Sequence, residues 1–161
     1  MRKKLLIVED NTELLELMRL GLKQAGFSIS TATNGLDALK KARSISPDLI
    51  ILDLILPELD GFAVCETLKR SPDTAAIPII LLTGLSSEFT RYAGIESGAD
   101  EYVTKPISPE QLVPKIERRL RAARTKENAA ENESISRSAA ENKSTSPEIF
   151  VKPNANSFFL K

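Results

Sequence analysis

Three carboxylates follow directly after short apolar runs of the sequence. Glu9 and Asp10 come after the run 5–8, and Asp53 comes after the run 49–52. A carboxylate can attack phosphorus directly and form a covalent acyl phosphate. Like charges ~4 Å apart cost ~4 kcal/mol per pair at an effective dielectric of about 20, so a site that gathers three carboxylates requires a cation. A hard divalent ion with oxygen ligands suits them, and we expect Mg²⁺.

The expected ligands of this ion come from the same part of the sequence. We expect Asp10 and Asp53 to hold Mg²⁺ through their carboxylates. Ile55, two residues after Asp53, is expected to add its backbone carbonyl oxygen. Glu9 is expected to orient water molecules bound to the ion, so the metal site is predicted to consist of these four residues.

Two further polar residues end the fourth and fifth apolar runs. Thr83 follows the run 79–82, and Lys105 follows Tyr102, Val103 and Thr104. Negative charge builds on the oxygens of a phosphoryl group during its transfer, and a hydroxyl, an ammonium group and a metal ion can stabilise it. A single carboxylate after a strand often only caps the next helix. Polar groups after successive strands indicate a site.

The elements that must position these residues are five strands and the helices between them. Segments with apolar residues at helical spacing separate the runs, and this alternation implies right-handed crossovers and a parallel sheet covered on both faces. We predict an α/β, flavodoxin-like, doubly wound sheet with strand order 2-1-3-4-5. In that order strands one, three and four are neighbours, and sites form beyond their carboxyl ends. The expected strands are 5–8, 27–32, 49–52, 79–82 and 102–104.

Composition excludes several other kinds of chemistry. The 161 residues contain no histidine, which excludes a Ser-His-Asp triad, a histidine metal site and a phosphohistidine in this chain. Lys+Arg and Asp+Glu both number 22, so no global field favours nucleic acid or a membrane. No run approaches the ~20 apolar residues that span a bilayer. The single cysteine, Cys65, fits a reducing cytoplasm.

The chain is expected to divide into three parts. The sheet domain should cover residues 1–124, and its last helix contains Pro114, which should delay or kink that helix at a cost of ~3 kcal/mol. Residues 125–147 are rich in Ser, Asn, Glu and Ala and are predicted to be a flexible low-complexity linker. Residues 148–161 are unassigned and fit a docking segment or the start of a further domain. The basic run 118–126 is interpreted as a solvated helix end rather than a DNA contact.

Taken together, these motifs resemble the response-regulator receiver family of two-component signalling over about residues 3–124. The residues that carry the resemblance are Glu9-Asp10, Asp53, Pro57, Asp60-Gly61, Thr83-Gly84 and Lys105-Pro106. The resemblance implies that Asp53 is the phosphoacceptor, that Mg²⁺ is the cofactor, and that a sensor histidine kinase or phosphotransfer protein is the donor. It also implies a cis Lys105-Pro106 peptide, an aromatic switch at Tyr102 coupled to Thr83, and a cytoplasmic protein.

The resemblance extends to partners and leaves some alternatives open. A downstream protein or an absent output domain is expected to read the switch, with a possible phosphorylation-dependent homodimer and no direct nucleic-acid contact by this chain. A receiver-like interaction module that works without phosphorylation is the main alternative. A haloacid-dehalogenase-type phosphatase would need a second acid where Ile55 stands, and a dinucleotide-binding enzyme would need G-x-G-x-x-G where residues 9–11 are Glu-Asp-Asn.

Overall fold

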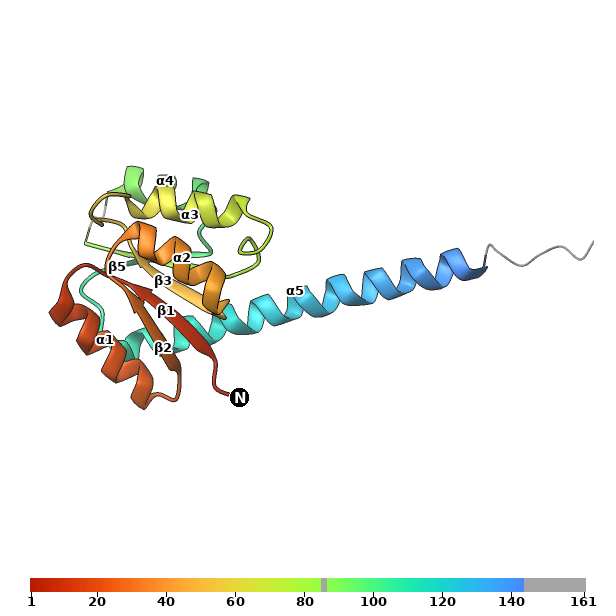
Figure 1. Cartoon of the computed structure of the whole chain (residues 1–161), viewed down its shortest axis with the longest axis horizontal. Helices are drawn as coiled ribbons and strands as arrows, with labels where there is room; N and C mark the ends of the chain where they lie inside the picture. The colour runs from red at the N-terminus through yellow and green to blue at the C-terminus, as the bar shows by residue number, and fades with distance from the viewer. Residues whose placement is uncertain (85–86, 144–161) are drawn as a thin grey trace, which may run out of the picture. The chain divides into compact units, whose positions relative to one another are not determined.

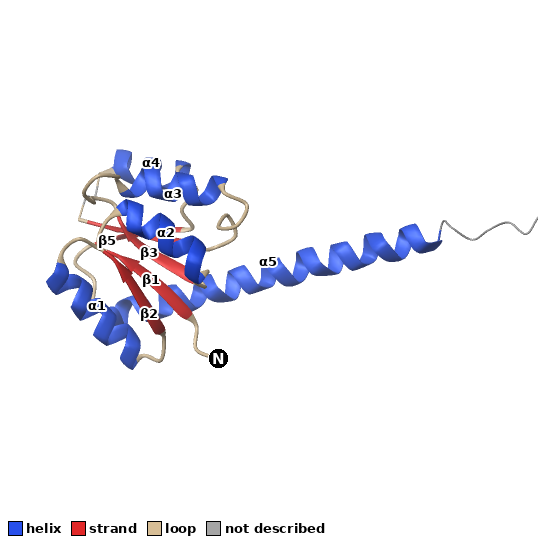
Figure 2. Ribbon diagram, in the orientation of Figure 1, coloured by secondary structure: helices blue, strands red, loops and turns tan. Residues whose placement is uncertain are grey.

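The protein is an alternating α/β chain with five strands and five helices among the residues described, 1–84 and 87–143 of the computed structural model. Every strand is parallel to its neighbours (Figures 1 and 2). In chain order the elements are β1 (Lys4–Val8), α1 (Thr12–Gln24), β2 (Ser28–Ala32), α2 (Gly35–Ile45), β3 (Leu49–Asp53), α3 (Gly61–Arg70), β4 (Ile79–Thr83), α4 (Glu88–Glu96), β5 (Glu101–Thr104) and α5 (Pro109–Lys143).

The strand order is β2-β1-β3-β4-β5, which confirms the predicted flavodoxin-like arrangement. Figure 2 shows the strands between α1 on one side and α2, α3 and α4 on the other. All five residues of β3 and of β4 are buried, because both faces of these central strands are covered. The edge strand β2 is more polar, with one buried residue, Ala32.

Two apolar clusters hold the helices against the sheet. Alternate residues along each strand point to opposite faces, so each strand contributes to both clusters. On one face, residues of the strands pack against Met18 and Leu22 of α1 and Leu112 and Ile116 of α5. On the other, strand residues pack against α2 and α3, including Ala38, Val64, Cys65 and Leu68.

The last helix begins without the delay expected from Pro114, and it ends later than expected. It begins at Pro109 behind a reciprocal cap, in which the backbone N–H of Gln111 donates to the Ser108 hydroxyl and that of Ser108 to the Gln111 side chain. It then runs through Pro114 without interruption. Proline removes one hydrogen-bond donor, and the loss is tolerated here in a helix whose Leu112 and Ile116 are fully buried.

The helix also continues through most of the expected linker. The chain divides into compact units at residue 125, yet α5 extends to Lys143. Ala, Glu, Lys and Arg favour the helix, and extending an existing helix avoids the cost of nucleation. The domain boundaries given above remain predictions, and residues 144–161, with the expected docking segment, lie outside the described residues. No helix of the described part is long and apolar enough to cross a bilayer.

Candidate functional site

The three predicted carboxylates meet at the carboxyl edge of the sheet. β1 and β3 are adjacent, with Val8 paired to Leu52, so the residues that follow them, Glu9 and Asp53, come together. One carboxylate oxygen each from Glu9, Asp10 and Asp53 lies within 4.8 Å of the other two. Glu9 and Asp53 are only 4% and 6% exposed, whereas Asp10 is exposed. Two of the three charges are therefore shielded from water.

Lys105 joins the two buried carboxylates. Its ammonium nitrogen lies 2.7 Å from Glu9 Oε2 and 3.1 Å from Asp53 Oδ2. Burial alone would lower the pKa of Lys105, but its hydrogen bonds to the two carboxylates raise that pKa overall. For Glu9, burial is the largest influence and raises the pKa, although Lys105 and a backbone N–H oppose the change. The Lys105-Pro106 peptide is cis, as the resemblance implied.

Asn11 belongs to the site although no role for it was predicted from the sequence. Its backbone N–H donates to Glu9 Oε1 at 3.1 Å, while its side chain caps α1 by accepting from the N–H of Leu14. Both carboxylate oxygens of Glu9 are thus engaged, one by Asn11 and one by Lys105. A helix cap directly after two acids is the signal that could have pointed to this residue.

The loop after β3 keeps the Asp53 backbone tightly packed. The backbone N–H of Ile55 donates a long bond of 3.4 Å to Asp53 Oδ1, and the Ile55 side chain is 60% exposed. Asp60 caps α3 by accepting from the N–H of Ala63. A Cβ at Gly61 would lie 2.3 Å from the Asp53 carbonyl oxygen, so only glycine fits there. This explains Gly61 as a structural partner of Asp53 and Asp60 as the cap of the helix that follows.

Thr83 and Tyr102 lie on neighbouring strands beside the carboxylates. Thr83 ends β4 and is fully buried, one residue beyond the pairing of Asp53 with Leu82. Its carbonyl accepts from the backbone N–H of Lys105 at 2.7 Å. Tyr102 is partly buried, and a Cβ at Gly94 of α4 would lie 2.8 Å from its ring. The ring therefore packs closely against α4.

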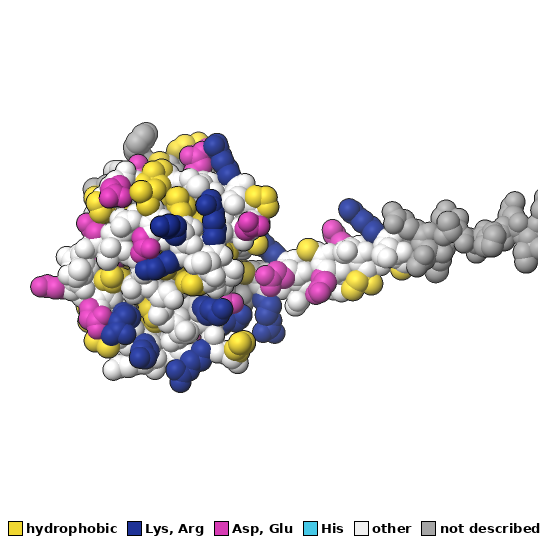
Figure 3. Space-filling view, in the orientation of Figure 1, with side chains coloured by type: hydrophobic (Ala, Val, Ile, Leu, Met, Phe, Trp, Pro, Cys, Tyr) yellow, Lys and Arg dark blue, Asp and Glu magenta, His cyan; other side chains and the backbone are white. Residues whose placement is uncertain are grey.

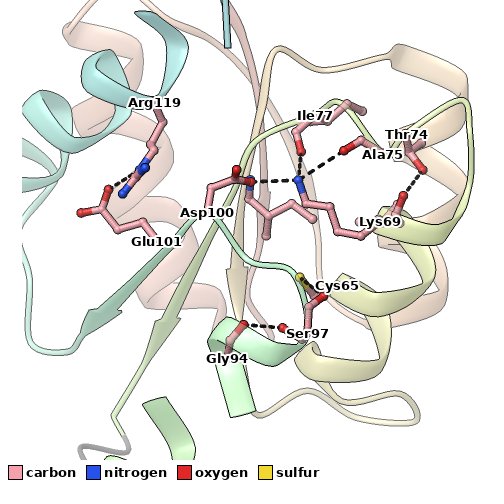
Figure 4. Close-up of polar contacts among 12 residues, drawn as sticks. Cys65, Lys69, Thr74, Ala75, Ile77, Gly94, Ser97, Asp100, Glu101 and Arg119 are labelled. Carbon is pink, nitrogen blue, oxygen red and sulfur yellow. Dashed lines mark hydrogen bonds and ion pairs between the residues drawn. The ribbon is translucent and has the colours of Figure 1, made fainter. Parts of the chain in front are cut away.

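A second charged cluster surrounds Glu101, the first residue of β5. Its carboxylate accepts from Arg118 at 2.6 Å, Arg119 at 2.8 Å and Lys115 at 3.4 Å, all on α5 (Figure 4 draws the Arg119 contact). Burial raises the pKa of Glu101, but the hydrogen bonds from the two guanidinium groups lower it overall. The cluster borders a hollow of about 380 Å³ that Gly94 and Tyr102 also line.

Polar contacts join the segment at the carboxyl end of α4 to α3 (Figure 4). The Lys69 ammonium donates to Asp100 at 2.8 Å and to the Ile77 carbonyl at 2.7 Å, and Asp100 also accepts from the N–H of Ile79. The buried Cys65 thiol lies 3.5 Å from the Ser97 carbonyl oxygen, and burial raises its pKa. Cys65 is thus a packed thiol with a structural role.

The residues gathered at this site suit metal-assisted chemistry at a carboxylate. The site gathers, at one sheet edge, an ammonium group and three carboxylates, whose oxygens suit a hard cation and of which one could act as a nucleophile. Glu9, Asp53 and Lys105 are brought together by direct contact, and Asp10 lies within 4.8 Å of the other two acids. The roles of the Ile55 carbonyl, Thr83 and Tyr102 remain predictions.

Comparison with known proteins agrees with this site. The family model for the response regulator receiver domain matches residues 5–117. The chain is 41% identical over 121 residues to the alkaline phosphatase synthesis transcriptional regulatory protein PhoP of Bacillus subtilis, covering 75% of this chain and 50% of that protein. The chain thus spans about half the length of the curated relatives it matches.

Solved structures give the same result. The chemotaxis response regulator CheY4 of Vibrio cholerae matches with a TM-score of 0.70 and 29% identity over 74% of this chain and 99% of that one. A BeF3-activated DrrB receiver domain matches with a TM-score of 0.66 and 34% identity over 75% of this chain and 99% of that one. The fold, the edge-of-sheet acids and the family match all point the same way, and the chain belongs to the response-regulator receiver-domain family of two-component signalling.

Proposed function

We propose that Asp53 accepts a phosphoryl group from a sensor histidine kinase or a phosphotransfer protein. The observation that carries this proposal is the place of Asp53, buried between the acids and the ammonium of Lys105. Because this chain has no histidine, the phosphohistidine must belong to the donor. In the transfer a carboxylate oxygen of Asp53 forms a P–O bond, the P–N bond breaks, and the imidazole nitrogen recovers a proton.

The hydrogen bonds favour Asp53 over its two neighbours as the nucleophile. Both oxygens of Glu9 accept hydrogen bonds, at 3.1 Å and 2.7 Å, which disfavours attack by either. Asp10 is exposed, where water stabilises its charge. Asp53 Oδ1 accepts only the long bond from the N–H of Ile55 within the described residues, and that bond competes weakly with a phosphorus atom.

The donor set suits Mg²⁺. Asp10, Asp53 and the Ile55 carbonyl would hold the ion, with Glu9 orienting its water. When bound, it would neutralise the carboxylates and stabilise charge on the transferred oxygens. The Lys105 ammonium, which lies 3.1 Å from Asp53 Oδ2, would stabilise the other side of that charge. The Thr83 hydroxyl, at the end of the adjacent strand, would donate to the same group.

The proposed output of this chemistry is a change of surface. Thr83 would move inward on phosphorylation, and Tyr102, packed on Gly94 of α4, would change its position with it. This requires the phosphoryl group to favour one state, because equal affinity for both shifts nothing. A downstream protein, an output domain or a second copy would read the face formed by α4, β5 and α5. Fluorinated-tyrosine NMR should show a shifted Tyr102 signal with a phosphoryl mimic, and an unchanged signal would remove the switch.

Intact mass spectrometry with acetyl phosphate tests the proposal. The wild type should gain one phosphoryl group when Mg²⁺ is present and none after chelation, while Asp53→Asn should gain none. Asp60→Asn is the matched control, because asparagine also caps a helix and Asp60 already acts as the cap of α3. Equal labelling of Asp53→Asn and the wild type would refute Asp53 as acceptor. No labelling of either would favour an interaction module that works without phosphorylation.

A further inference from the structure

A basic surface lies at the amino edge of the sheet, remote from the carboxylates. Two hollows meet there at Phe27, one of about 580 Å³ and one of about 240 Å³. Figure 3 shows Lys and Arg side chains gathered over this lower part of the globular unit, where the chain begins and α1 ends. Six basic residues and one acidic residue line the two hollows: Arg2, Lys3, Arg19, Lys23, Arg121, Arg124 and Glu117.

The positive charge of this surface is only partly balanced. Lys3 pairs with Asp48, Arg19 with Glu16, and Arg121 with Glu117. Across the described residues, Arg2, Lys23 and Arg124 form no ion pair. All three are exposed. Counting both hollows and these partner acids, six positive charges face three negative ones, which leaves a surplus of three.

The helix dipole explains one cation of this surface but not Arg121 and Arg124 of α5. Basic residues in the last turn of a helix are stabilised by the helix dipole, which accounts for Lys23 at the end of α1. The sequence suggests the same explanation for the basic run 118–126, as cations at a helix end. However, α5 continues to Lys143, so Arg121 and Arg124 lie far from its end. Glu101 accounts for Arg118 and Arg119 of that run but not for these two.

We propose that this basic surface binds an acidic polypeptide segment that also carries an aromatic or aliphatic side chain. Guanidinium groups match carboxylates in a two-pronged geometry, and arginines make up four of the six cations. The apolar side chains of Phe27 and Leu120 line the larger hollow, which suits a side chain inserted between the charges. Among the described residues, none of the side-chain hydrogen bonds and ion pairs of Asp53 involves a residue of this surface, so we expect it to bind whether or not Asp53 is phosphorylated.

The interleaved acids make a polypeptide a better fit than nucleic acid. A phosphate backbone carries one charge per nucleotide and would meet Glu16, Asp48 and Glu117 among the cations. A polypeptide can place neutral residues opposite these acids and carboxylates opposite the unpaired cations. The overall balance of 22 basic and 22 acidic residues also provides no long-range attraction for a polyanion.

Fluorescence anisotropy on the full chain tests this inference. The probes are a labelled peptide of glutamates and phenylalanines spaced by Gly-Ser, the same peptide with glutamine for glutamate, and a labelled DNA duplex. The test variant is Lys23→Gln/Arg124→Gln. The matched control is Lys40→Gln/Arg43→Gln, which also removes two exposed cations, one of them in the last turn of a helix. Asp53→Asn serves as a second control.

The acidic peptide should bind the wild type, and the test variant should bind it about tenfold more weakly, since each exposed charge pair contributes modestly. The matched control and Asp53→Asn should stay within about twofold of the wild type. The glutamine peptide should not bind. Equal binding by the test variant, or no binding of the acidic peptide at low salt, would overturn the inference. Tighter binding of the DNA duplex with the same loss in the test variant would overturn it in favour of a nucleic-acid surface.

Discussion

The two edges of the parallel sheet carry opposite charge, and they differ in whether that charge is buried and paired or exposed to water. At the carboxyl edge, Glu9 and Asp53 are almost fully buried, and each contacts the same ammonium group of Lys105. At the amino edge, Arg2 and Arg124 are exposed and unpaired within the described residues. Buried charge must be compensated by a partner, whereas exposed charge is compensated by water. Burial, rather than the number of charged residues, therefore distinguishes the proposed phosphorylation site from the proposed recognition surface.

Replacing Lys105, which contacts both buried carboxylates, should have the largest effect on stability. Lys105→Met leaves two buried carboxylates without their cation, and breaking such a pair should cost about 3 kcal/mol in metal-free buffer. Lys3→Met, which breaks the exposed pair with Asp48 at the amino edge, should cost less than about 1 kcal/mol. Urea unfolding of both variants measures the contrast. Equal losses would mean that burial does not distinguish the two edges.

Adding Mg²⁺ should stabilise the protein through the carboxylates of the carboxyl edge. A ligand at 100 times its dissociation constant stabilises the folded state by about 2.7 kcal/mol, and relief of carboxylate repulsion would make Mg²⁺ such a ligand here. Asp10→Ala should shrink the increase in melting temperature caused by Mg²⁺, although it can raise stability without metal by removing one of the repelling charges. Asp60→Ala, at the α3 cap, should leave the Mg²⁺ effect intact. A wild type that does not respond to Mg²⁺ contradicts the metal site.

Glu101 provides a third case, because its side chain is 9% exposed, close to the 8% of Asp53, but its three cations are 30–58% exposed against 22% for Lys105. Its pKa is lower in the folded state than its ordinary value of 4.5. The stability it contributes is therefore present above pH 4.5 and is lost as the pH falls through the folded pKa. Glu101→Gln should cost about 1–2 kcal/mol at neutral pH, and the gap to the wild type should close in acid. If the difference in unfolding free energy between Glu101→Gln and the wild type does not change with pH, the variant loses stability through packing rather than through charge.

Much of the fold, and the meeting of the three acids at one sheet edge, could be predicted from the sequence, because both depend on local patterns. Continuous apolar runs separated by helical segments determine the layers, and the polar residue after each run falls at one sheet edge. The contact of Lys105 with both Glu9 and Asp53 could not be predicted, since it joins residues 96 and 52 positions apart. The close approach of Gly61 to the Asp53 carbonyl depends on the loop path and is equally invisible.

The amino edge and the end of α5 were harder to predict for different physical reasons. The basic surface is assembled from Arg2, Lys23 and Arg124, which no local pattern connects. Residues 126–143 have the composition of a linker and little apolar surface to bury, which favours disorder. Yet the same Ala, Glu and Lys residues favour a helix once one is already formed at Pro109. Composition alone does not show that the preceding helix is available to be extended.

The most direct test of the central claim is to locate the phosphorylated atom. An acyl phosphate is reduced by borohydride to an alcohol, which converts a phosphorylated aspartate into homoserine. After treatment with acetyl phosphate, Mg²⁺ and borohydride, peptide sequencing by mass spectrometry should find homoserine at position 53 and unmodified carboxylates at Glu9 and Asp10. Homoserine at position 10, or intact aspartate at position 53 in protein that has gained a phosphoryl group, would contradict the account.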